Sequence, residues 1–69
     1  MGMRFCKKTP TLDGMTEFYW VDDGFFFLGY VCLTEGGYVS SPIPIVEIRE
    51  DLKTYPTKEE AAWDLPKRN

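Results

Sequence analysis

Short runs of β-forming residues, separated by turn residues, dominate the first forty positions of the chain. Turns are indicated at Asp13-Gly14, Asp23-Gly24 and Gly36-Gly37, because aspartate and glycine favour tight reversals. Between them lie runs rich in aromatic and β-branched side chains, which favour strands. We expect strands in residues 3–8, 17–21, 25–33 and from residue 38 onward.

Two prolines interrupt the pattern after this region. Pro42 and Pro44 would remove ladder hydrogen bonds from a central strand, so residues 41–44 are expected at a sheet edge or in a crossover. Alternation of apolar and polar positions resumes over residues 45–49. Residues 51–56 are expected to form a loop.

One helix is indicated, near the end of the chain. Thr57 followed three residues later by Glu60 fits a capping box, and Pro66 would end the helix. Two turns are too few for stability in isolation, so the helix must dock on the sheet through its small apolar side chains. The fold predicted for the single domain of 69 residues is α+β: a three- to four-stranded antiparallel meander with one short C-terminal helix packed on it. A small all-β barrel with a terminal helical turn is the alternative.

The aromatic hairpin around Asp23-Gly24 has an unusual distribution of side chains. A two-residue turn would place Trp20 opposite Phe27 and Phe18 opposite Gly29. One face would then carry Phe18, Trp20, Phe25 and Phe27, and the other Tyr19, Val21, Phe26, Leu28 and Tyr30. Both faces would be apolar, although an antiparallel sheet usually keeps one face polar.

Something must therefore cover the second face. Flanking segments could do so with Phe5, Leu12, Met15, Leu52 and Tyr55; a second copy, a partner protein or a small ligand are the alternatives. Because tyrosine tolerates water better than phenylalanine, the tyrosine-bearing face is expected to be the exposed one and the other the core. The binding residues predicted on it, with their acidic rim, are Glu17, Tyr19, Val21, Asp22, Asp23, Phe26, Tyr30, Glu35 and Tyr38.

Charge narrows the choice of partner. The net charge is −3, and residues 9–48 contain six acidic side chains and neither lysine nor arginine. Nucleic-acid binding draws its affinity from cations, and here only Arg4, Lys7 and Lys8 precede the acidic region, so a nucleic-acid partner is disfavoured. A protein partner with a basic surface is expected instead, and a homodimer stays open.

The sequence contains few of the residues that form catalytic or metal sites, and few targeting signals. The chain has no histidine and two cysteines, Cys6 and Cys32, which cannot complete a zinc site by themselves; a disulfide between them would require the first and third strands to pair. We therefore expect no catalytic residues, no metal and no cofactor. The longest uncharged stretches, such as residues 24–34, are too short to cross a membrane, and no secretory signal is visible, so a cytoplasmic location is expected.

The closing segment Tyr-Pro-Thr-Lys-Glu-Glu-Ala-Ala-Trp-Asp-Leu, residues 55–65, is similar to the ends of prophage restriction-alleviation proteins. The zinc-binding cysteines of those proteins are missing here, so their metal site is not carried over. The resemblance implies a small phage-type accessory protein of a bacterial host. Combined with the acidic, aromatic sheet, it predicts a non-catalytic module that binds and inhibits a host protein. A single-stranded nucleic-acid-binding β-domain, using the same aromatics with the basic N-terminus, is the alternative.

Overall fold

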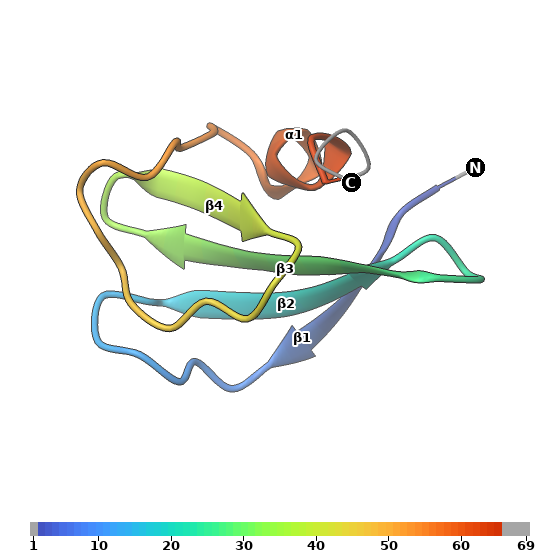
Figure 1. Cartoon of the computed structure of the whole chain (residues 1–69), viewed down its shortest axis with the longest axis horizontal. Helices are drawn as coiled ribbons and strands as arrows, with labels where there is room; N and C mark the ends of the chain where they lie inside the picture. Colours follow the sequence, from blue (N-terminus) through green and yellow to red (C-terminus); the bar gives the residue numbers. More distant parts are fainter. Residues whose placement is uncertain (1, 66–69) are drawn as a thin grey trace.

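A computed structural model describes residues 2–65 and shows one antiparallel sheet with a short helix (Figure 1). The sheet order follows the chain order, which confirms the predicted α+β meander. The elements are β1 (Arg4–Lys8), β2 (Glu17–Asp22), β3 (Phe27–Thr34), β4 (Gly37–Ser41) and α1 (Lys58–Trp63).

Residues 45–49 form no strand, contrary to what their alternation suggests. After β4 the chain turns at Pro42 and crosses in front of the sheet in the view of Figure 1. Ile45, Ile48 and Leu52 pack from this segment against a small core cluster. The alternating pattern therefore reflects a loop with one side on the sheet, and the prolines prevent it from joining the ladder.

The helix begins as its capping box predicts. The Thr57 side chain accepts a hydrogen bond from the backbone N–H of Glu60 at 3.1 Å. Before the helix, backbone groups of Tyr38 and Tyr55 exchange two hydrogen bonds of 2.9 and 2.8 Å, which hold the chain on the outer edge of β4. The helix itself ends at Trp63, with Asp64 as its C-cap; Pro66, expected to end it, lies outside the described residues.

Apolar side chains cover both faces of the sheet over much of its length. On one face, α1 closes over the helix-side cluster of Tyr19, Val21, Val31, Ala61, Ala62 and Leu65. On the other face, a second cluster of Met15, Cys32 and Val39 is covered by Leu12 and by the segment that follows β4. The second face is therefore covered by flanking segments only around Cys32 and Val39, away from the tip of the β2–β3 hairpin.

The strand order also decides the state of the two thiols. Strand β2 separates β1 from β3, so the pairing that a disulfide would require does not occur. Cys6 is an exposed free thiol and Cys32 a buried one. Burial raises the pKa of the Cys32 thiol to about 11.

The β2–β3 hairpin departs from the predicted two-residue turn. Residues 23–26 form the loop, and the next pair is Asp22 with Phe27. The following pair is Val21 with Gly29, so Leu28 is an extra residue in β3. Such a bulge reverses the alternation of side chains beyond it, and Tyr30 therefore faces Trp20 instead of joining Tyr19.

Two local features explain the longer loop and the bulge that follows it. The Asp23 carboxylate accepts hydrogen bonds from the backbone N–H groups of Phe25 at 2.8 Å and Phe26 at 2.7 Å, which closes a four-residue loop. Gly29 adopts a φ of 152°, which side chains other than glycine rarely adopt. The Asp-Gly sequence was therefore correctly associated with a turn, but with the wrong length.

Candidate interaction surface on the aromatic hairpin

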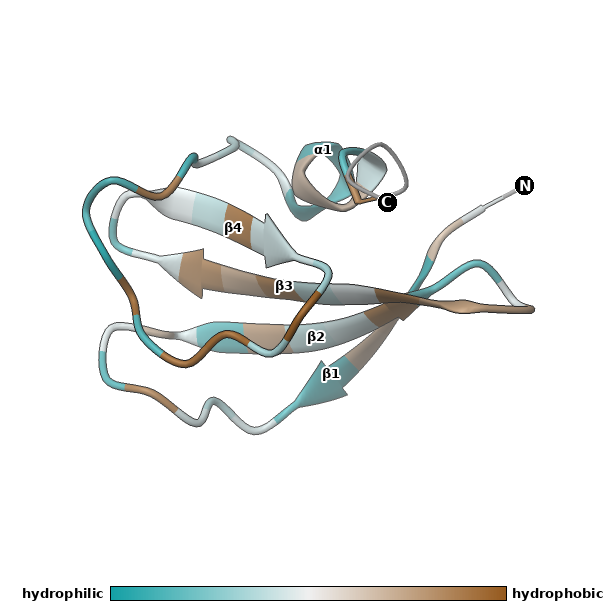
Figure 2. Ribbon diagram, viewed as in Figure 1, coloured by the Kyte–Doolittle hydropathy of each residue, from teal (hydrophilic) through white to brown (hydrophobic). Residues whose placement is uncertain are grey.

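Four large aromatic side chains are exposed together at the free end of the β2–β3 hairpin. We call this set the hairpin patch: Trp20, Phe25, Phe26 and Phe27, with exposed fractions of 44%, 83%, 72% and 51%. Figure 2 shows the hydrophobic colour reaching the tip of the hairpin, beyond the area covered by the helix or by the loop after β4. Contiguous exposed apolar surface on a small protein typically marks a contact site.

Ring packing gives the patch a defined shape at its base. Phe27 contacts Tyr30 edge-to-face with ring centroids 5.1 Å apart, and Trp20 contacts Phe27 in the same manner at 5.9 Å. Farther from the tip, Phe18 and Tyr30 stack at 6.1 Å. These contacts restrict the rings before any partner arrives, which lowers the entropic cost of binding.

Two aspartates at the loop hold the tip in place. Asp22 accepts hydrogen bonds from Arg4 Nε at 2.8 Å and from the backbone N–H of Gly24 at 2.7 Å. The Arg4 guanidinium is the main reason that the pKa of Asp22 is lowered, and the N–H groups of Phe26 and Phe25 lower the pKa of Asp23. Both carboxylates are thus engaged in maintaining the loop.

Lys8 of β1 shares the face of the hairpin patch. Cys6 pairs with Trp20, and Lys8 pairs with Phe18, so their side chains project to the same side of the sheet. Lys8 Nζ lies 4.3 Å from the centroid of the Trp20 ring, in a cation–π contact. The patch therefore has a cationic border along β1.

The predicted assignment of the two hairpin faces is wrong for most of their residues, although Phe26 is exposed as expected. Tyr19 and Val21, expected in an exposed contact surface, are 7% and 0% exposed and lie under the helix. Trp20, Phe25 and Phe27, expected in the core, are exposed. The longer loop and the bulge changed the register, and only the burial of the complete structure shows which face the helix covers.

Tyr19 has a structural role in its buried position. Its hydroxyl donates a hydrogen bond to the Glu17 carboxylate, and this bond together with burial raises the pKa of Tyr19 to about 12. Lys58 Nζ lies 4.7 Å from the centroid of the Tyr19 ring. The residue thus links the sheet to the helix.

The acidic residues predicted to surround the binding surface lie at two opposite ends of the sheet. Glu17 begins β2 and Glu35 lies in the β3–β4 turn, whereas Asp22 and Asp23 lie at the opposite end of the sheet. Tyr38 is half-buried and packs against the helix-side cluster. Of the nine predicted binding residues, those that lie at or beside the hairpin patch are Asp22, Asp23, Phe26 and Tyr30.

The sequence contained a signal for the residues that were missed. Phe25, Phe26 and Phe27 are consecutive, and successive residues of a strand point to opposite faces, so a single core could not bury all three. Lys8 was considered only as a phosphate contact, because its position beside Trp20 depends on the β1–β2 register.

Within residues 2–65, no three His, Cys, Asp or Glu side chains gather closely enough to hold a metal ion. No helix within the same residues has the length and apolarity needed to cross a membrane. Comparison with protein-family models, curated proteins and solved structures finds no significant match to this chain.

Proposed function

We propose that this protein is a non-catalytic interaction module that binds a partner protein through the hairpin patch. The observation that carries the proposal is the joint exposure of Trp20, Phe25, Phe26 and Phe27 at one end of the sheet. Aromatic side chains supply most of the binding energy at protein interfaces when they enter apolar pockets of the partner.

The proposed partner offers an apolar groove to the tip of the hairpin. The net charge of −3 supports a partner with a basic surface, since long-range attraction speeds encounter. Near the groove itself the charges are mixed, because Asp23 lies at the loop and Lys8 at the border of the patch. Inhibition of a host protein by a phage-type accessory protein stays a prediction from the sequence, as does a bacterial cytoplasm as its location.

Site-specific photocrosslinking in cells tests this proposal. A photoreactive phenylalanine analogue would replace Phe26, and in the control it would replace Val46, which is equally exposed at 79% but lies in the loop after β4. We expect one discrete adduct with another protein from position 26 and none from position 46. Equal labelling from both positions would contradict the proposal, and an adduct with twice the mass of the 8.0 kDa chain would indicate a homodimer instead.

Single-stranded nucleic acid is a second candidate, and one observation favours it. Lys8 lies beside Trp20 and the stacked rings of Phe18 and Tyr30, which is the combination of cation and aromatic face that such binders use. Titration with labelled single-stranded DNA and RNA at low salt separates the candidates. Micromolar binding that weakens steeply with salt and is lost in Lys8→Glu would favour nucleic acid over a protein partner.

A further inference from the structure

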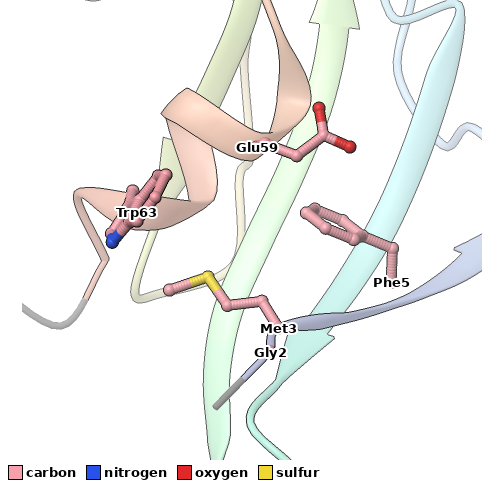
Figure 3. Close-up of a pocket in the computed structure, with 5 residues that line it drawn as sticks. All are labelled: Gly2, Met3, Phe5, Glu59 and Trp63. Carbon is pink, nitrogen blue, oxygen red and sulfur yellow. The ribbon is translucent and has the colours of Figure 1, made fainter.

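A second surface feature lies on the helix side of the sheet, away from the hairpin patch. A pocket of about 210 Å³ opens between β1 and α1. It is lined by Gly2, Met3, Phe5, Glu59 and Trp63 (Figure 3).

Aromatic rings and a carboxylate form the lining. In Figure 3, Phe5 and Trp63 stand on opposite sides of the pocket, the Met3 side chain lies between them, and the Glu59 carboxylate is beside Phe5. Phe5 is held by an edge-to-face contact with the buried Tyr19, at 6.0 Å between centroids. Glu59 is the only ionisable side chain among the described residues that line the pocket.

Trp63 is notable for its position on the helix. Its neighbours Ala61 and Ala62 are fully buried, whereas Trp63 is 68% exposed and lies outside both core clusters. The fold therefore does not need a large ring at this position. A ring that forms one wall of an open pocket is better explained by contact with a ligand.

We propose that this pocket binds an alkylated ammonium group, such as a trimethylammonium head group. The electron-rich faces of Phe5 and Trp63 and the negative charge of Glu59 attract a cation, and the apolar walls favour one that is surrounded by methyl groups. A metal ion would find a single carboxylate, and a neutral apolar ligand would gain nothing from the negative charge of Glu59.

A neighbouring contact shows that Phe5 already accepts an ammonium group. Lys58 Nζ lies 5.2 Å from the centroid of the Phe5 ring, although Lys58 is not one of the residues that line the pocket. Its positive charge opposes a second cation nearby. Lys58 therefore limits the affinity of the pocket, and its removal should strengthen binding.

Titration followed by NMR tests the site with the full chain. The ligands are tetramethylammonium, choline and free Nε-trimethyllysine, and 3,3-dimethylbutan-1-ol serves as the neutral counterpart of choline. The indole N–H resonance of Trp63 reports the pocket, and that of Trp20 is an internal control on the opposite face of the sheet. We expect the Trp63 signal to shift with a Kd of about 1 mM or lower for at least one cation, and with no saturation for the alcohol.

Variants then assign the effect to the lining. Glu59→Gln should weaken binding about fivefold and Trp63→Ala about tenfold or more. Glu60→Gln is the matched control, because this glutamate neighbours Glu59 on the exposed side of α1 without lining the pocket, and it should leave the Kd unchanged. Lys58→Gln should tighten binding about twofold to threefold.

The outcomes separate the sources of the cation. Tighter binding of choline would indicate a small metabolite, and tighter binding of trimethyllysine would indicate a methylated protein side chain. Binding of the neutral alcohol as tight as that of choline would overturn the proposal, as would an unchanged Kd in Glu59→Gln or no shift of Trp63 with any of the cations. None of these results depends on the hairpin patch.

Discussion

Lys8 Nζ lies 4.3 Å from the ring centroid of Trp20, so a cation of the edge strand contacts an exposed aromatic of the neighbouring strand. A cation–π contact at an exposed position contributes about 0.5–1 kcal/mol. We expect Lys8→Gln to lower the free energy of unfolding by about this amount in urea titrations. Lys7→Gln, on the opposite face of β1, is the control and should change it less; an equal effect of both variants would contradict the assigned contact.

Gly29 is where the bulge of β3 passes closest to another strand. A Cβ atom at this position would stand 2.5 Å from the Ser41 carbonyl oxygen and 3.0 Å from Leu65 Cδ2, at a φ of 152°. We expect Gly29→Ala to lower the free energy of unfolding by about 2 kcal/mol or more, because backbone must move. Gly36→Ala, whose nearest contact would be at 3.6 Å, should stay within about 0.5 kcal/mol. Equal stability of the two variants would show that the bulge is misplaced.

Leu65 and Trp63 are close in the sequence but differ in burial, so their truncation should affect stability differently. Leu65 is fully buried in the helix-side cluster, whereas Trp63 is 68% exposed. Leu65→Ala should cost about 2–4 kcal/mol in thermal or chemical unfolding, since it leaves a cavity between α1 and the sheet. Trp63→Ala should change the free energy of unfolding by less than about 0.5 kcal/mol, although it removes the larger side chain. A larger loss for Trp63 would contradict the assigned orientation of the helix.

Acid should weaken the hairpin loop. The pKa values of Asp22 and Asp23 are lowered from 3.8 in the folded protein, so their ionised forms favour folding. This contribution is fully present above pH 3.8, the ordinary pKa of an aspartate, and is lost as pH falls through the lowered values. In urea titrations from pH 6 downward, the double variant Asp22→Asn/Asp23→Asn should show a weaker loss of stability between about pH 4 and pH 2 than the natural chain. Identical pH profiles would contradict the role assigned to the two carboxylates.

Local signals in the sequence were sufficient for most of the fold. Thr57 and Glu60 located the start of the helix, and turn residues located the strand connections to within a few positions. These features depend on neighbours in the chain, so they can be recognised without tertiary contacts. The same holds for Ala61 and Ala62, whose small size indicated close packing on the sheet.

The arrangement of the candidate site depends on one extra residue in β3, which the local sequence pattern does not predict. The extra residue Leu28 exchanged the faces of every later residue in β3, so Tyr30 appeared with Trp20 instead of Tyr19. Which face the helix covers then followed from the burial of Val21, Val31 and Leu65 together. Long-range packing of this kind is not encoded in a spacing pattern, and the sequence alone therefore assigns three of the four exposed aromatics, Trp20, Phe25 and Phe27, to the core.

We propose that the hairpin patch, whose four aromatic side chains are exposed, is a binding surface and not a part of the core. The test compares the Kd of the partner identified by crosslinking at position 26 for two double variants, each of which replaces two exposed apolar side chains with serine. Phe25→Ser/Phe26→Ser removes the tip of the patch, and Ile43→Ser/Val46→Ser alters the loop after β4, where both side chains are also exposed. We predict that the first variant weakens binding about 100-fold with unchanged stability, and that the second stays within about twofold. Equal affinity of the two variants would contradict the proposed function.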